Sequence, residues 1–147
     1  MPPIWALGFH QSRWSYKSEG EIRELVAGFK QHSLPLSCIH LDIDYMQGHR
    51  VFTINKELFP DLAGLAYELA QDGIRVVTIL DPGVKIDKKY FLYQSGLRNN
   101  VFCQDPNGRL VRGLVWPGWA VFPDFTKTGS RQWWGSLSGR GRDDCKN

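Results

Sequence analysis

The sequence lacks the residue patterns of several common functional sites. Its three cysteines, Cys38, Cys103 and Cys145, lie far apart without a C-x-x-C pair, and their odd number does not complete a disulfide framework. It contains no H-E-x-x-H metal motif, no G-x-S-x-G nucleophile elbow and no glycine-rich phosphate loop. We therefore expect no metal site, no cofactor and no serine or cysteine nucleophile.

The sequence also lacks a strong charge and a long hydrophobic run. With 18 Lys and Arg against 15 Asp and Glu, the net charge is +3, which is too small to suggest nucleic-acid binding. No stretch reaches the roughly 18 apolar residues of a membrane span, and the first residues carry no basic n-region of a signal peptide. We expect a cytoplasmic protein that binds neither nucleic acid nor membrane.

What the sequence has in excess is aromatic residues. Aromatic residues make up 13% of the 147 residues and include six Trp. Because Trp is costly to expose, it is often kept where a flat apolar face meets a ligand or partner. Core packing remains the better interpretation for any single aromatic residue.

Apolar periodicity predicts alternating strands and helices. Three short apolar runs, at residues 4–9, 38–43 and 74–80, have the composition of buried strands. The first helix is predicted to start at Ser18, which forms a capping box with Glu21, and the second to span residues 62–72 and end before Gly73. This βαβαβ order is typical of an α/β fold with a parallel sheet.

Residues beyond 82 are less regular. They predict a short helix at 89–97, a hairpin turn at Asn107-Gly108 and a further strand at 114–115.

Two α/β architectures compete, a doubly wound nucleotide-binding sheet and a (β/α)8 barrel. The missing phosphate loop and the polar residues at the strand ends favour the barrel. The strand ends Phe9, Leu41 and Leu80 are 32 and 39 positions apart, so eight such units need roughly 250 residues or more. We therefore expect an incomplete (β/α)8 TIM barrel that comprises the first three to four βα units.

Two carboxylates lie at the ends of predicted strands. Asp42 ends the second strand and Asp81 ends the third, and on neighbouring parallel strands they would lie about 5 to 10 Å apart. Such residues can be helix caps or ion-pair partners, or they can accept hydrogen bonds from the hydroxyls of a ligand.

Aromatic side chains occur in the loops expected at the same end of the sheet: Trp14, Tyr16, Tyr45 and Trp116. Aromatic planes combined with carboxylates suit a pyranose, which has apolar C–H faces and a rim of hydroxyls. The histidines show no metal-ligand spacing, and His40, on a buried strand, is interpreted as an interior histidine with a hydrogen-bond partner.

Four ordered blocks carry a resemblance to a known family. They are WALGFHQSRWSYKS (5–18), LDIDYMQGHRVFT (41–53), VVTILDPGV (76–84) and VWPGWAVFPDFT (115–126). These blocks resemble the catalytic domain of glycoside hydrolase family 31, the α-glucosidase family, and correspond to the N-terminal part of its barrel. The resemblance implies a (β/α)8 barrel preceded by a β-sandwich and a retaining hydrolase of terminal α-linked glucose that uses two aspartates.

The resemblance also implies which residues bind sugar in subsite −1. Asp42 would bind the hydroxyls, with Ile43 beside it, while Asp44 and Tyr45 match the same motif and can be structural. The implied substrate-binding residues are Asp42, Ile43, Asp81, Trp116, Trp14 and Ile79. The implied partner is an α-glucoside or malto-oligosaccharide substrate, whereas linkage, chain length, the choice among hydrolase, transglycosidase and lyase, and the oligomeric state stay open.

The catalytic carboxylates of that family are not among these residues. Its nucleophile lies in a W-x-D-M-N-E type block on the next strand, with the acid/base further on, and neither block is present. We expect residues 1–135 to form a partial catalytic barrel and residues 136–147, SLSGRGRDDCKN, to be an unrelated, disordered tail.

We interpret the change in sequence character near Ser136 as the loss of the reading frame, by truncation or frameshift. We interpret the abrupt start at a barrel strand as the loss of the N-terminal β-sandwich. We therefore expect the 147-residue chain to be an inactive fragment of a retaining α-glucosidase. The alternatives are a carbohydrate-binding remnant and a non-functional truncated product.

Overall fold

The computed structural model describes residues 1–140, and at positions 139 and 140 only the backbone. The chain forms two units, which are described one at a time. The first contains residues 1–49 and 53–80, and the second contains residues 50–52 and the chain from residue 81 onward.

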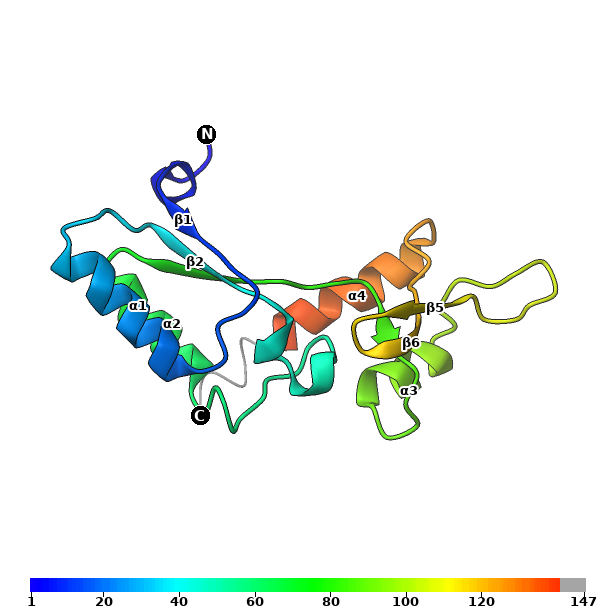
Figure 1. Ribbon diagram of the computed structural model, residues 1–147. Coiled ribbons are helices and arrows are strands. Elements are labelled where there is room, and N and C mark those ends of the chain that lie inside the picture. The colour runs from blue at the N-terminus through cyan, green and yellow to red at the C-terminus, as the bar shows by residue number, and fades with distance from the viewer. Residues whose placement is uncertain (141–147) are drawn as a thin grey trace. The chain divides into compact units, whose positions relative to one another are not determined.

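The first unit is a three-stranded parallel sheet with two connecting helices. Its strands are β1 (His10–Gln11), β2 (Cys38–Leu41) and β3 (Arg75–Thr78), in the order β1-β2-β3. The register places His10 opposite Cys38 and Ile39 opposite Val76. The crossovers contain α1 (Glu19–Gln31) and α2 (Leu62–Gln71), which lie side by side (Figure 1). The predicted α/β class with a βαβαβ order is confirmed.

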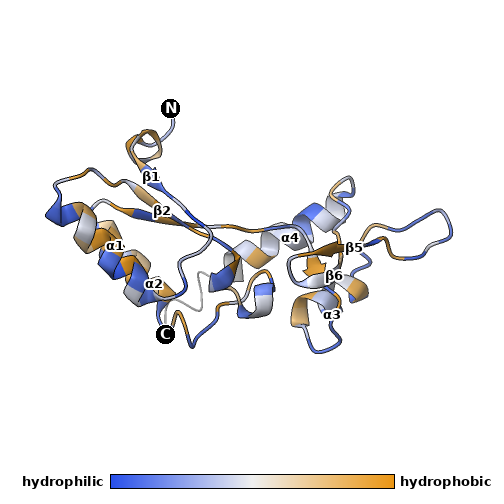
Figure 2. Cartoon of the chain, in the orientation of Figure 1, coloured by the Kyte–Doolittle hydropathy of each residue, from blue (hydrophilic) through white to orange (hydrophobic). Residues whose placement is uncertain are grey.

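Both helices form where the sequence carries a cap and an apolar stripe. The Ser18 hydroxyl accepts a hydrogen bond from the Glu21 amide, and Asp61 accepts one from the Gly64 amide. Figure 2 shows hydrophilic and hydrophobic residues alternating around both helices, and Ile22 of α1 is completely buried. On the polar side, Lys30 and Asp72 pair at 2.7 Å and link α1 to α2.

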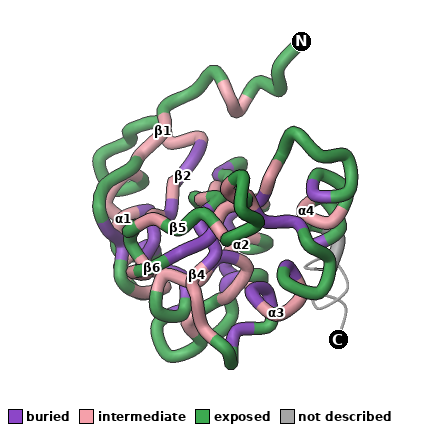
Figure 3. The backbone as a smooth tube through the Cα atoms, turned by 90° about the vertical axis from the view of Figure 1, so that its right-hand side faces the viewer, coloured by how far each residue is buried: buried purple, intermediate pink, exposed green. Residues whose placement is uncertain are grey.

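The segment before β1 differs from the prediction. Residues 4–9 were expected to form a strand, but Ile4–Leu7 forms a 3-10 helix, η1, and the sheet begins only at His10. Ile4 and Leu7 are 89% and 75% exposed, and Figure 3 shows the exposed N-terminal segment leading into β1. An apolar run does not by itself distinguish strand from helix, because strand formation needs a partner in register.

The chain after β2 turns through two short 3-10 helices, η2 (Ile43–Tyr45) and η3 (Gln47–His49). His49 Nε2 lies 3.1 Å from Asp44 Oδ1, within hydrogen-bonding distance, so Asp44 has a partner inside this turn.

The second unit is built on an antiparallel sheet. Its strands are β4 (Val84–Lys85), β5 (Arg112–Val115) and β6 (Gly118–Val121), in the order β4-β6-β5. The predicted strand at 114–115 exists, but it pairs antiparallel with β6 rather than extending a parallel sheet. The predicted turn at Asn107-Gly108 is present, with Gly108 at φ +77° in the left-handed region.

Two helices complete this unit, α3 (Phe91–Arg98) and α4 (Thr128–Arg140). Residues 136–140, for which the sequence predicts disorder, continue helix α4, and Leu137 among them is 7% exposed. Packing of Leu137 outweighs the weak helix propensity of the serines and glycines around it. Residues 141–147 lie outside the described residues.

No helix between residues 1 and 140 combines the length and apolar character that a membrane crossing requires.

Candidate functional site

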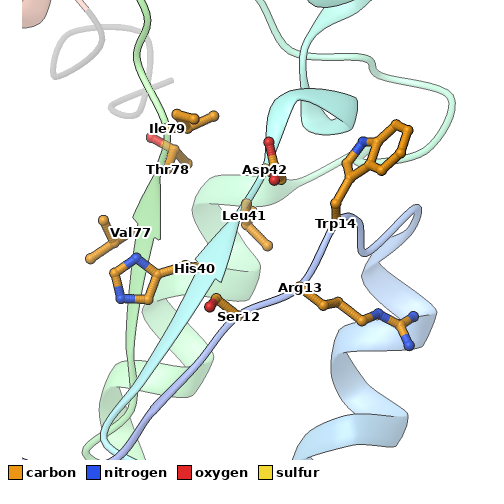
Figure 4. Close-up of a pocket in the computed structure, with 9 residues that line it drawn as sticks. All are labelled: Ser12, Arg13, Trp14, His40, Leu41, Asp42, Val77, Thr78 and Ile79. Carbon is orange, nitrogen blue, oxygen red and sulfur yellow. The ribbon is translucent and has the colours of Figure 1, made fainter.

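A cavity of about 370 Å³ opens at the carboxyl ends of the three parallel strands in the first unit. This volume lies within the range of about 300–1,000 Å³ typical of small-molecule sites. Figure 4 shows the side chains that line it, which come from the segment after β1 and from β2, β3 and the residues that follow them. The lining residues are Ser12, Arg13, Trp14, His40, Leu41, Asp42, Val77, Thr78 and Ile79.

Asp42 stands at the end of β2, where the parallel sheet meets this cavity. Its Oδ1 accepts a hydrogen bond of 2.7 Å from the Ile43 amide and caps η2. Its Oδ2 has no hydrogen-bond partner among residues 1–140, and the residue is half-buried. One oxygen therefore caps a turn, and the other is available to accept a hydrogen bond from a ligand.

Trp14 lines the cavity from the segment that follows β1. Its indole is 74% exposed, so the aromatic face is available to a ligand. The neighbouring Arg13 points away from Asp42 (Figure 4) and pairs with Glu21 at 3.1 Å. Tyr16, which was grouped with Trp14, is 2% exposed and accepts a hydrogen bond from Gln11 Nε2, so it belongs to the core.

Ile79 lines the cavity immediately after β3, and Tyr45 fixes its backbone. The Tyr45 hydroxyl donates a hydrogen bond of 2.9 Å to the Ile79 carbonyl oxygen, which ties η2 to the end of β3. Ile43 is 4% exposed, and its side chain packs in the core beside Asp42 rather than lining the cavity.

His40 contributes a polar group deeper on β2. Its Nε2 lies 2.9 Å from His10 Nδ1, which agrees with the predicted partnered interior histidine. Sequence analysis nevertheless missed His40 as a lining residue, together with Ser12 and Thr78. The available signal was the period of two along a strand, which places His40 and Asp42 on the same face of β2.

Asp81 and Trp116 belong to the second unit. Asp81 is half-buried, and Trp116 is 66% exposed in the turn that joins β5 to β6. Their expected roles beside Asp42 stay predictions.

The side chains that line the cavity can bind a ligand, but they do not include the pair of carboxyl groups that cleaves a glycosidic bond. Of its nine lining residues, Asp42 alone is acidic, whereas retaining hydrolysis of a glycoside needs two carboxyl groups about 5 to 5.5 Å apart. Carboxylate, hydroxyl and indole groups together suit a ligand that has both hydroxyls and apolar C–H faces.

Residues 1–143 match the family model described as the glycosyl hydrolases family 31 TIM-barrel domain. The chain is 52% identical over 135 residues to Alpha-glucosidase 2 of Bacillus thermoamyloliquefaciens, an alignment that covers 92% of this chain and 17% of that protein.

Solved structures show the same likeness. A family 31 alpha-glucosidase of Bacteroides thetaiotaomicron superposes with a TM-score of 0.79 at 40% identity and covers 91% of this chain and 23% of the other. The alpha subunit of glucosidase II, in its alpha3-Glc2-bound form, gives a TM-score of 0.88 at 30% identity, with 91% and 14% covered. The chain thus spans between about a seventh and a quarter of the length of these relatives.

Proposed function

Because this chain belongs to glycosyl hydrolase family 31, through the TIM-barrel domain, we propose that it forms part of subsite −1 of a retaining α-glucosidase. The substrate class is an α-glucoside or malto-oligosaccharide with a terminal α-linked glucose. The observation that carries the proposal is the carboxylate of Asp42, with one oxygen unpartnered among residues 1–140, in a cavity that it shares with an exposed indole.

Each side chain has a defined task in this proposal. Asp42 Oδ2 accepts hydrogen bonds from hydroxyls of the glucose ring, and charged acceptors make hydrogen bonds of about 1.5–3 kcal/mol. The indole of Trp14 covers an apolar C–H face of the ring. Ile79 supplies an apolar wall. The resemblance to the family also assigns Asp81 and Trp116 to substrate binding. The Ile43 amide donates to Asp42 Oδ1 and so holds the carboxylate in place.

The proposal separates binding from bond cleavage. These residues hold the sugar, and the nucleophile and acid/base of the family lie in sequence blocks that the 147 residues do not contain. We therefore propose that the 147-residue chain alone does not hydrolyse an α-glucoside. Turnover of a chromogenic α-glucoside by the purified chain, at a rate above that of Asp42→Ala, would refute this part.

A chimera tests the function of the segment in a complete enzyme. Residues 1–135 replace the matching segment of Alpha-glucosidase 2, with which this chain is 52% identical over 135 residues. We expect α-glucosidase activity in the chimera and a loss of kcat/KM of at least tenfold in Asp42→Ala, from the hydrogen-bond energies above.

The matched control is Asp72→Ala, which removes an exposed carboxylate from the ion pair with Lys30. It should leave kcat/KM within twofold of the chimera. An active chimera whose kcat/KM is insensitive to Asp42→Ala contradicts the assignment of Asp42. Binding of glucose to the isolated chain without turnover, measured by calorimetry, is the outcome that favours a carbohydrate-binding remnant.

A further inference from the structure

A second cluster of reactive side chains lies on the first two strands, independent of the proposed sugar-binding role. His10, Cys38 and His40 each present one potential ligand atom, and these three atoms lie within 4.8 Å of one another. Cys38 is completely buried, and both histidines are half-buried. We propose that His10 Nδ1, Cys38 Sγ and His40 Nε2 form a binding site for Zn²⁺.

The strand register creates this cluster. Parallel pairing sets His10 opposite Cys38, and His40 follows Cys38 by two residues on the same strand. Since side chains alternate between the two faces of a strand, Cys38 and His40 share a face, and His10 joins them from β1. Ligands on regular strands are held more precisely than ligands on loops.

The hydrogen bonds already orient His10 as a metal ligand. A carbonyl oxygen can only accept, so His10 Nε2–H donates to the Trp5 carbonyl oxygen at 3.3 Å, and the Nδ1 lone pair is left to face His40. Metal-binding histidines commonly donate their second ring N–H to a carbonyl or carboxylate in this way, which fixes the tautomer and the ring. The Trp5 carbonyl thus supplies the outer support that such a site needs.

The distances require only side-chain adjustment. Tetrahedral Zn²⁺, with bonds of about 2.05 Å to nitrogen and 2.3 Å to sulfur, places two nitrogens about 3.3 Å apart and nitrogen and sulfur about 3.6 Å apart. The two histidine nitrogens now lie 2.9 Å apart and must separate slightly, while the sulfur must move closer. Binding replaces the proton shared by the histidines and the weak 3.8 Å contact of Cys38 Sγ with the Ile39 carbonyl.

The ligand set selects the ion. Two imidazoles and a thiolate suit Zn²⁺ and similar borderline metals, and they do not suit Mg²⁺ or Ca²⁺, which require oxygen ligands. Three protein ligands leave the fourth tetrahedral position for water. Because His40 also lines the cavity, the ion lies next to the site that contains Asp42.

Cobalt substitution tests the site in a chain that keeps only one thiol. The untagged 147-residue chain carries Cys103→Ser and Cys145→Ser, is freed of metal with a chelator, and is titrated with Co²⁺ under a non-thiol reductant. We expect one equivalent to bind, with tetrahedral Co²⁺ absorption and a thiolate-to-metal charge-transfer band that only Cys38 can produce. Zn²⁺ should displace the cobalt and abolish both signals.

Matched variants identify the other ligands. His10→Gln and His40→Gln should each raise the Kd for Co²⁺ at least tenfold, while His32→Gln, at an exposed histidine of α1's carboxyl end, should leave it unchanged. Circular dichroism of each variant confirms that the fold is kept. The absence of a charge-transfer band at one equivalent overturns the proposal and leaves a hydrogen-bonded histidine pair only, as does a band that neither histidine variant weakens.

Discussion

The same substitution, glycine to alanine, should have opposite effects on stability in two helices. At Gly96 in α3, an added Cβ would lie 2.1 Å from Phe102 Cζ and within 2.9 Å of two more ring carbons. At Gly28 in α1, an added Cβ meets nothing within 4 Å. Alanine is favoured over glycine by about 1 kcal/mol inside a helix, so only the contact with Phe102 distinguishes the two positions.

The Phe102 ring cannot move away cheaply. Reaching an ordinary contact of 3.4 Å from 2.1 Å needs a shift of about 1.3 Å, yet Phe102 is 1% exposed. Its ring stacks on Tyr93 at 6.1 Å and meets Trp133 edge-on at 6.0 Å. Overpacking costs typically 1–3 kcal/mol, and overlap with three ring atoms favours the upper end. After the helix-propensity gain, Gly96→Ala should destabilise by about 2 kcal/mol, and Gly28→Ala should stabilise by about 1 kcal/mol.

Urea unfolding measures both values. Far-UV circular dichroism follows both variants. Tryptophan fluorescence is dominated by the second unit, because four of the six Trp residues lie in it. A double variant isolates the cause, because Phe102→Leu removes the ring and should abolish most of the cost of Gly96→Ala. The reasoning is refuted if Gly96→Ala is as stable as the unmodified chain, if Gly28→Ala is less stable, or if the cost of Gly96→Ala persists without the Phe102 ring.

Two further predictions concern titrating groups. Hydrogen bonds from the Arg50 side chain and then from the Lys89 amide lower the pKa of the Asp87 carboxyl below its ordinary value of 3.8. The stability that Asp87 contributes is therefore fully present above the ordinary pKa and is lost as the pH falls through the folded-state pKa. Asp87→Asn should lower the Tm at pH 7 and weaken the acid-induced fall in Tm, and parallel Tm–pH curves for the two proteins would contradict this. Burial raises the pKa of the Cys38 thiol, and Cys103 is only half-buried. In metal-free protein, a disulfide reagent should therefore label Cys103 before Cys38, which peptide mass spectrometry measures. Equal labelling rates of the two cysteines would contradict this prediction.

Local signals predicted the first unit well where local interactions decide the structure. The hydroxyl of Ser18 and the apolar spacing from Ile22 onward specify α1 without any distant partner, and α1 begins where they place it. Residues 4–9 show the limit. Their apolar composition suits a strand, but a strand forms only where another strand supplies hydrogen bonds. Strand β2 pairs with His10 and Gln11 instead.

The second unit shows the same limit at a larger scale. The strand at 114–115 was predicted from composition, but its direction depends on the turn after it, where Gly118 adopts φ +98° and returns the chain antiparallel. Helix α4 extends past residue 135 because buried contacts hold it: the Ser130 hydroxyl donates to the Val101 carbonyl, and Trp133 packs on Phe102. Neither contact can be inferred from the helix propensity of the segment itself.

The two candidate sites also differ in whether one segment of the sequence is enough to predict them. Asp42 was predictable because a polar residue at the end of a buried strand marks the functional edge of a parallel sheet, and the cavity does lie there. The cluster of His10, Cys38 and His40 was not predictable, because its first two members are 28 positions apart and no short motif spans that interval. Pairing of β1 with β2 brings His10 next to Cys38 in the fold. Motif absence in a sequence therefore excludes metal sites formed within one segment, and it says nothing about sites that strand pairing assembles.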